Sequence, residues 1–380
     1  MKRSIVTVCI FSAMLLGLAI LNLTTPIKAF SENENRYLKQ LPDFSWEGLF
    51  AGKYTPALDD FVIDQFAYRD TWVGVKTMSE RILLRNSSGG AYFARDGSVI
   101  EMFDNVDRER FSRNLTFVSG LADIVRESNG VRTTVMLVPT QSMIRSHMLP
   151  PFAPEADQRG MLDEAASTLA GSAVFIDVSD RLLSHRDEYI FYKTDHHWTS
   201  LGAYYSYNSM RSQLGRREKS IDNFRLELLT TEFYGTTWSK ASLYSVPPDT
   251  IIAYISRDVA EIGALHIEYG DGESFSNSFY ECSFLDTKDK FSVFLNGNHS
   301  VTRITTGKEN GRRLLVVKDS FANNFTQFLI SDYEEVILLD PRYFRESYAQ
   351  FAVDNDITDM LVLYSLKGFA SDANLFYLTA

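Results

Sequence analysis

The stretch RLLVVKDSFANNF, residues 313–325, decides the fold. It joins an apolar run to Asp319 and Ser320 and continues into the helix-like segment FANNFTQFLISDY. An apolar run of this length is typical of a strand covered on both faces. Ser320 would lie at a strand-to-helix turn, where its N–H and the helix dipole can stabilise an oxyanion. On this segment alone a helix N-cap is favoured over a nucleophile, because Ser and Asp are preferred caps.

Four further apolar runs repeat the strand pattern, and amphipathic segments alternate with them. The expected strands are residues 133–139, 173–179, 334–340 and 359–365. Helices are expected at residues 107–128 and from about residue 200 to 214. This alternation predicts an α/β fold with a doubly wound, mainly parallel sheet, helices on both faces, and a site at the C-terminal edge of the strands.

The N-terminal 30 residues differ from the rest of the chain. Lys2 and Arg3 precede an uncharged, largely apolar run at residues 5–23, which fits either a secretory signal or a single-span anchor. Ile27 and Ala29 make a poor cleavage signal, so an uncleaved anchor is favoured. Both interpretations predict that the remaining chain lies outside the cytoplasm.

The exported part is expected to contain a helical lead-in segment, residues 31–90, and an α/β domain, residues 91–380. Residues of about 230–298 are rich in Tyr, Ser, Gly and acidic side chains, with β-like runs such as IIAYIS and FSVFLNG. They interrupt the strand–helix alternation and predict a β-rich insertion beside the sheet.

Composition excludes some classes of function. The chain has 380 residues, is 45% hydrophobic and carries a formal net charge of −11. Such acidity argues against binding nucleic acid or an anionic membrane surface through charge. Its two cysteines, Cys9 and Cys282, provide no intramolecular disulfide framework once Cys9 lies in the membrane segment.

A second stretch, KTDHHWTSLGAYYSY at residues 193–207, carries candidate chemistry. On an extended backbone Asp195 and His197 would point the same way and His196 the opposite way. Asp195 could then orient His197 as the base for Ser320, with Trp198 as a wall of the site. The alternative is that both histidines are structural. Because adjacent histidine side chains diverge, no metal and no cofactor are expected.

Weaker candidates lie after other apolar runs. Asn298 in LNGNH is a possible oxyanion donor or an ordinary turn residue. Arg342 in DPRYF is a candidate for binding a polysaccharide carboxylate or the acyl oxygen, or for a surface ion pair. Tyr343 and Trp238 are candidates for stacking on sugar rings, although such aromatic residues are more often core.

The chain resembles the DHHW family and, through it, the alginate O-acetyltransferase group of SGNH-hydrolase-like proteins. The matching motifs, in order, are FSENENRYL, DQFAYRD, AYFARDGSVIE, MLVPTQ, DHHWTSLGAYY, KDSFANNF, LLDPRYF and DMLVLYS. The resemblance implies a permuted SGNH-hydrolase-like domain at residues 91–380, with Asp195, His197 and Ser320 as its triad. Lys318 departs from the family pattern, which commonly has glycine before the Asp-Ser pair.

The resemblance also implies a function. The expected protein is a membrane-anchored, extracytoplasmic O-acetyltransferase that modifies a cell-surface or secreted polysaccharide through an acetyl-serine intermediate. A membrane-bound O-acyltransferase partner would supply the acetyl group. Two alternatives stay open: an acetylesterase with the same triad, and a non-catalytic protein that binds polysaccharide or assists its assembly. If the N-terminal signal were cleaved, the protein would be secreted.

Overall fold

The computed structural model describes residues 2–31, 36–243, 245–257, 265–270, 272 and 274–379. The chain divides into two compact units. The first comprises Met1–Gly89 with Ser239–Tyr244, and the second comprises Gly90–Trp238 with Ser245–Ala380.

The first unit is mainly helical. Its elements are α1 (Lys2–Thr24), β1 (Phe30–Ser31), β2 (Arg36–Tyr37), α2 (Trp46–Phe50), α3 (Tyr54–Asp64), α4 (Arg69–Ile82) and β3 (Ser87–Ser88). In α1 the span Ile5–Thr24 has a mean hydropathy of 2.4, and none of it is buried. By length and composition this helix can cross a membrane, and a signal sequence would have the same properties.

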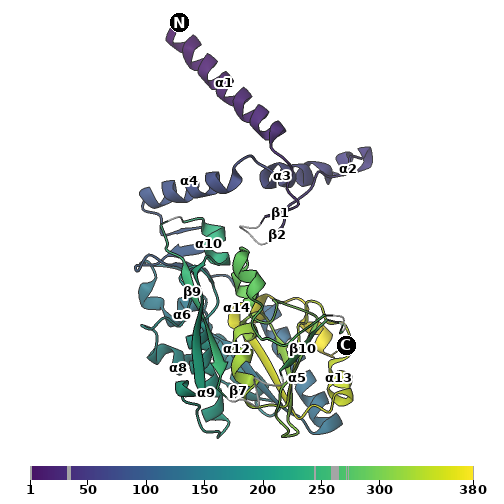
Figure 1. The fold of residues 1–380 in the computed structure, drawn as a ribbon. Helices are drawn as coiled ribbons and strands as arrows, with labels where there is room; N and C mark the ends of the chain where they lie inside the picture. The colour runs from purple at the N-terminus through teal and green to yellow at the C-terminus, as the bar shows by residue number, and fades with distance from the viewer. Residues whose placement is uncertain are drawn as a thin grey trace. The chain divides into compact units, whose positions relative to one another are not determined.

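The second unit is built on one large sheet (Figure 1). Its strand order is β11-β10-β12-β14-β13-β15-β6-β7. The five expected strands are present as β6 (Arg132–Val138), β7 (Val174–Ile176), β13 (Arg313–Lys318), β14 (Glu335–Leu339) and β15 (Asp359–Ser365). They run parallel to one another. The remaining strands, β10 (His266–Tyr269), β11 (Ser274–Ser276) and β12 (Val301–Thr305), are added antiparallel.

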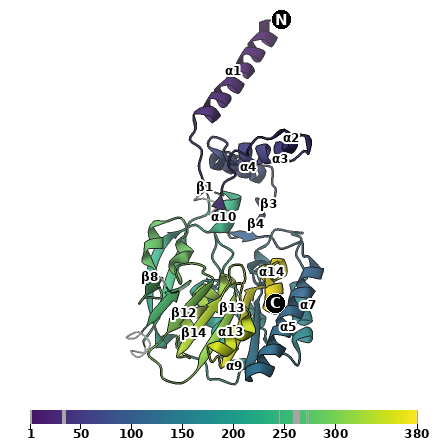
Figure 2. The same cartoon turned by 90° about the vertical axis from the view of Figure 1, so that its right-hand side faces the viewer.

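Helices cover both faces of this sheet, which confirms a mixed α/β fold (Figure 2). One face packs against α5 (Arg108–Asn129), α7 (Gln158–Leu169), α13 (Tyr348–Asp354) and α14 (Leu366–Ser371). The other packs against α9 (Ser200–Gln213) and α12 (Phe321–Leu329). Successive side chains of a strand point to opposite faces, so both sides of each central strand must be apolar.

Short elements complete the second unit around this core. They are β4 (Ala91–Phe93), β5 (Val99–Glu101), α6 (Gln141–Ile144), η1 (Ser146–Met148), α8 (Ser179–Ser184), η2 (Ile221–Asn223) and η5 (Leu375–Thr379). Both cysteines are free.

The expected insertion is not wholly separate from the sheet. β8 (Phe224–Phe233) and β9 (Asp249–Ser256) form their own antiparallel ribbon, and α10 (Thr236–Ala241) lies between them in sequence. By contrast, β10 and β11 extend the edge of the large sheet. The run FSVFLNG was expected to be β-like, but its first residues belong to the 3-10 helix η4 (Lys290–Val293), which follows η3 (Cys282–Asp286).

The apolar segment before the double histidine, residues 189–194, does not form a strand of the sheet. Within the part of the chain that the structure describes, its β-type pairing is limited to an isolated bridge between Phe191 and Trp198. The N–H of Tyr192 donates to the carbonyl of His197 at 3.3 Å, so residues 193–197 form a bend between these paired positions.

Candidate active site

Ser320 lies where β13 ends and α12 begins. It occupies the N-cap position of α12, but its side chain makes no capping hydrogen bond. Asp319 stabilises the turn instead: one carboxylate oxygen accepts the N–H of Phe321 at 2.9 Å, and the other accepts the N–H and hydroxyl of Ser365 at 2.9 and 2.8 Å. The Ser320 hydroxyl is therefore not used as a cap, contrary to the ordinary role expected from this segment alone.

That hydroxyl is hydrogen-bonded to a histidine 123 positions away in the sequence. Ser320 Oγ lies 2.7 Å from His197 Nε2. His197 Nδ1 lies 2.5 Å from Asp195 Oδ1. The side chains of Asp195 and His197 are buried, with exposed fractions of 2% and 6%. The structure thus brings together the serine, histidine and aspartate that the sequence predicted as a triad.

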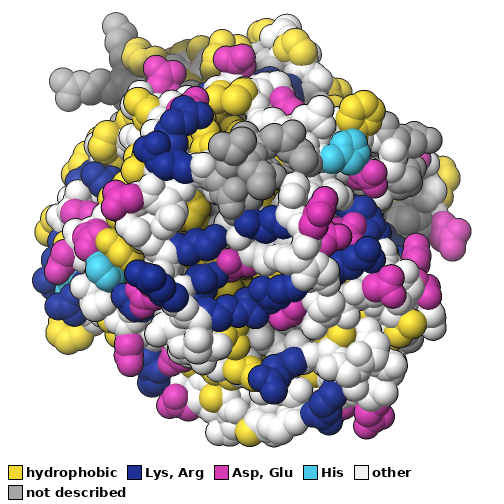
Figure 3. Space-filling model, turned by 60° about the horizontal axis from the view of Figure 1, so that its bottom comes forward, with side chains coloured by type: hydrophobic (Ala, Val, Ile, Leu, Met, Phe, Trp, Pro, Cys, Tyr) yellow, Lys and Arg dark blue, Asp and Glu magenta, His cyan; other side chains and the backbone are white. Residues whose placement is uncertain are grey.

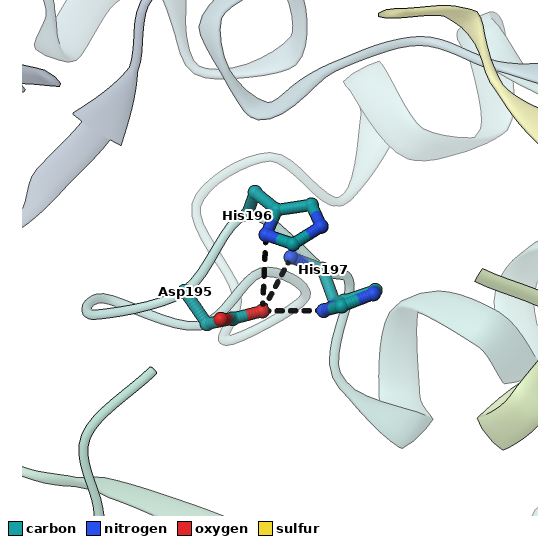
Figure 4. A group of neighbouring side chains, drawn as sticks. All are labelled: Asp195, His196 and His197. Atoms are coloured by element: carbon teal, nitrogen blue, oxygen red, sulfur yellow. Dashed lines mark hydrogen bonds and ion pairs between the residues drawn. The ribbon is translucent and has the colours of Figure 1, made fainter. Parts of the chain in front are cut away.

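The backbone achieves this pairing in a different way from the one expected. Residues 193–197 form a bend rather than an extended segment. Asp195 Oδ1 also accepts the N–H of His197 at 3.0 Å, which is the hydrogen bond of an Asx-turn. His196 does not point away from the pair: its ring centroid lies 3.9 Å from that of His197, with the planes tilted by 37° (Figure 4).

A threonine that sequence reasoning missed supports the aspartate. Asp195 Oδ2 accepts the N–H of Thr236 at 2.7 Å and its hydroxyl proton at 3.0 Å. The preceding Gly235 leaves room for the carboxylate, because a Cβ there would lie 2.2 Å from Asp195 Cβ and 2.3 Å from Oδ2. Nothing in the sequence around Thr236 distinguished it, since its role depends on contact with a loop 41 residues earlier.

The charges of the pair follow from this environment. Burial disfavours a charged Asp195, but neighbouring His196 and His197 and the hydrogen bonds from His197 hold the pKa of its carboxyl below the usual range. Burial, reinforced by His196, lowers the pKa of His197 to about 4 although Asp195 opposes this shift. At neutral pH the structure therefore supports an ionised Asp195 and a neutral His197, whose Nε2 can accept the Ser320 proton.

Aromatic rings hold His197 in place. Phe291 stacks on its imidazole with centroids 3.9 Å apart and planes 12° apart. Trp198, expected to wall the site, is instead fully buried in the core and stacks on Phe325. Its indole N–H is hydrogen-bonded to the Phe321 carbonyl and to Asn324 Oδ1, so it fixes α12, and it is not among the residues that line the pocket beside Ser320.

A pocket of about 490 Å³ opens beside Ser320. His196, Arg342 and Lys367 contribute to its lining, together with Thr140 and Gln141. Arg342 donates two hydrogen bonds to the buried Asp340, at 2.8 and 2.5 Å, so much of its charge is compensated inside the protein. Lys367 donates to the carbonyl of Met102 at 2.7 Å.

Other predicted site residues lie outside the pocket lining. Tyr343 is 55% exposed on the surface. Trp238 packs against Tyr234, with Lys288 Nζ 4.4 Å from its ring centroid. Asn298 is exposed, and its Oδ1 accepts hydrogen bonds from Lys318 at 2.8 Å and Asn323 at 3.2 Å. Asn298 therefore packs against the first turn of α12, and its role as an oxyanion donor stays a prediction.

Lys318 replaces the glycine common before the Asp-Ser pair without distorting the turn. It is the last residue of β13 and is not among the described residues with a positive φ. Its buried ammonium group bonds Asn298 and Asn323 at 2.8 Å each and lies 3.8 Å from Asp340. Burial lowers the pKa of Lys318 to about 8, although Asp340 opposes this shift.

Asp195, His196 and His197 also present one potential metal ligand each, within 4.8 Å of one another. The expectation that the adjacent histidines diverge is therefore wrong. However, Asp195 Oδ1 and His197 Nδ1 already bond each other at 2.5 Å. A metal ion using both atoms would have to break that hydrogen bond, so these residues fit a serine-activating arrangement better than a metal site.

Comparison with known proteins supports the resemblance seen in the sequence. Residues 155–339 match the family model described as DHHW protein. The resemblance to the DHHW family is confirmed. A DHHW family protein from Eubacterium siraeum is 24% identical, with a TM-score of 0.65 over 77% of this chain and 95% of that chain.

Two further matches have lower sequence identity. Bacillus cereus PatB1, solved with a sulfonyl adduct, is 18% identical, with a TM-score of 0.64 over 75% of this chain and 97% of that one. The O-acetyltransferase domain of Pseudomonas putida AlgJ is 13% identical, with a TM-score of 0.46 over 74% of this chain and 93% of that one. No curated protein matches the chain.

Proposed function

We propose that this chain is an O-acetyltransferase that carries the acetyl group on Ser320. The observation that carries the proposal is the continuous hydrogen-bonded series from Asp195 through His197 to the Ser320 hydroxyl, which faces the pocket. A serine with its proton directed to a neutral, buried imidazole is arranged for nucleophilic attack. Capping, the ordinary alternative role, is taken by Asp319.

The reaction would proceed in two halves. Ser320 Oγ attacks the carbonyl carbon of an acetyl donor while His197 Nε2 takes its proton, which then goes to the leaving group. In the second half a hydroxyl of the acceptor attacks the acetyl-serine, His197 takes that proton, and the proton returns to Ser320 Oγ. In both halves Asp195 stabilises the imidazolium.

The backbone N–H of Ser320 can hold the oxyanion. Within the described part of the chain no hydrogen bond uses this donor, and it lies at the N-terminus of α12, whose dipole favours negative charge. Asn298 is the proposed second donor.

The proposal also covers the cellular location of the protein, its acceptor and its acetyl donor. The apolar α1 supports a membrane-anchored protein with its second unit outside the cytoplasm. The acceptor would be a cell-surface or secreted polysaccharide, bound over the pocket near Arg342 and Tyr343. The family resemblance implies that a membrane-bound O-acyltransferase supplies the acetyl group.

The test is to trap the intermediate. The full chain is incubated with p-nitrophenyl acetate, and peptide mass spectrometry should find one acetyl group on Ser320. A sulfonyl fluoride should compete for the same residue. Ser320→Ala should abolish both modifications, and His197→Ala should slow acetylation by about 10³-fold or more, because Ser320 loses its base.

The outcomes separate the competing functions. Transfer of the acetyl group to an added polysaccharide supports the proposal, whereas release to water alone identifies an esterase. Binding of polysaccharide without any modification of Ser320 would indicate a non-catalytic protein. Full acetylation activity in both variants would rule out the triad.

A further inference from the structure

His196 is the member of the double histidine that the proposed mechanism does not use. Its Nδ1 lies 2.9 Å from the hydroxyl oxygen of Thr236. The same hydroxyl donates to Asp195 Oδ2 at 3.0 Å. The three groups therefore share a short hydrogen-bonded series whose protons can be assigned.

Proton counting fixes the tautomer of His196 in its uncharged form, which is the form that can accept a hydrogen bond. An ionised carboxylate can only accept hydrogen bonds, so the single Thr236 hydroxyl proton is directed to Asp195. The Thr236 oxygen must then accept from His196, and the proton of neutral His196 resides on Nδ1. Nε2 of His196 consequently carries a lone pair and can only accept.

This basic nitrogen is available to a ligand. His196 contributes to the lining of the pocket beside Ser320, and 29% of its side chain is exposed. Among the described residues none forms a hydrogen bond with His196 Nε2. In Figure 4, Nε2 lies on the side of the ring away from Asp195.

His197 has the same tautomer for the same reason, because its Nδ1 donates to Asp195. Two Nδ1-protonated imidazoles therefore stand with centroids 3.9 Å apart, each with an unprotonated Nε2. His197 takes the proton of the attacking hydroxyl, and that one proton cannot go to both bases. His196 is thus suited to a second hydroxyl that lies beside the attacking one.

We infer that His196 selects acceptors with two neighbouring hydroxyl groups, such as the vicinal diols of carbohydrates. One hydroxyl attacks acetyl-Ser320 while its neighbour donates a hydrogen bond to His196 Nε2. This inference rests on the proposed function and adds a specificity-determining residue to it. No bond to His196 forms or breaks in the reaction, so the residue acts by positioning the acceptor.

The experiment compares two small acceptors, one with a neighbouring hydroxyl and one without it. Ser320 is acetylated with p-nitrophenyl acetate in the presence of equal concentrations of ethylene glycol and ethanol, and the two acetate esters are quantified by chromatography. Ethylene glycol has two hydroxyls, so an unselective site would favour it about twofold. We expect the wild-type chain to favour it by a further fivefold or so, the usual effect of one hydrogen bond.

Two substitutions of His196 test the contribution of its Nε2 atom to the preference. His196→Asn keeps a donor for Thr236 but has no atom at the position of Nε2, so the preference should fall to about the statistical twofold value. His196→Gln can place an amide oxygen near that position and should retain part of the preference. Both esters form from the same acetyl-Ser320, so their ratio measures the preference whatever the rate of acetylation in His196→Asn. The exposed His266 gives a matched control, His266→Asn, which should behave as the wild type.

The inference is overturned if the wild type shows only the statistical preference, or if His196→Asn keeps the wild-type preference. It is also overturned if His196→Gln and His196→Asn lose the preference equally, since that would indicate a structural role and not a hydrogen bond accepted at the position of Nε2. If wild-type Ser320 acquires no acetyl group by mass spectrometry, the proposed function itself has failed and the inference fails with it.

Discussion

At the scale of single residues, the two adjacent histidines differ through their neighbours. His197 is buried, stacked on Phe291 and bonded at both ring nitrogens. His196 borders the pocket and is bonded at one. The sequence indicated that Asp195 and His197 form a pair, because their spacing suits it. The tautomer of His196 could not be predicted, because it depends on Thr236 from a distant segment.

The lowered pKa of His197 predicts an unusual pH profile. A base must be unprotonated, so acetylation of Ser320 should rise with pH through about 4, the pKa of His197, and be nearly constant from about pH 5.5 to 8. Stopped-flow measurement of the p-nitrophenol burst from pH 3.5 to 8, corrected for spontaneous hydrolysis, checks this expectation. A midpoint near 6.5, the ordinary value for histidine, would contradict the burial effect.

At the scale of secondary structure, continuous apolar runs correctly predicted the central strands of the sheet. The strands β6, β13, β14 and β15 coincide closely with the expected segments because both of their faces are buried. The segments at residues 189–194 and 291–297 carry similar apolar residues but do not form strands of the sheet. Their apolar side chains are buried in the core although their backbone is irregular. The spacing of apolar residues in the sequence cannot distinguish such a segment from a strand.

The close approach of two segments at Gly235 gives a further prediction. Gly235→Ala should displace the Asp195 carboxylate, since the added Cβ would lie 2.2 Å from Asp195 Cβ. We expect Ser320 acetylation to fall by about a hundredfold, because small misplacements of catalytic groups have effects of this size.

Burst kinetics and thermal unfolding should be measured together on this variant. Gly120→Ala on α5 serves as the control, because its nearest neighbour is a Thr379 methyl group at 3.1 Å. A Gly235→Ala chain that is folded and acetylated at the wild-type rate would show that Asp195 has more freedom than the structure indicates.

At the scale of the whole molecule, charge is balanced locally although the net charge is −11. Figure 3 shows a face on which Lys and Arg side chains are interspersed with Asp and Glu. Near the N-terminal ends of the central strands, ion pairs join Arg303 to Glu335 at 2.6 Å and Arg312 to Asp359 at 3.1 Å. Cations paired in this way offer little attraction to nucleic acid.

The proposed anchor predicts how the chain fractionates. If α1 spans the membrane, the full chain should sediment with membranes, resist extraction with alkaline carbonate and dissolve in detergent. Immunoblotting of the fractions, with N-terminal sequencing of the recovered protein, gives the measurement. Recovery in the medium with an N-terminus beyond residue 24 would instead identify α1 as a cleaved signal.

The distance in sequence between Ser320 and His197 has a consequence for folding. Their hydrogen bond closes a loop of 123 residues, and contacts of such long range form only after a large loss of chain entropy. The nucleophilicity of Ser320 should therefore appear late during refolding, after local helices have formed. The rate at which a sulfonyl fluoride labels Ser320 during refolding would then measure how fast the native topology is completed.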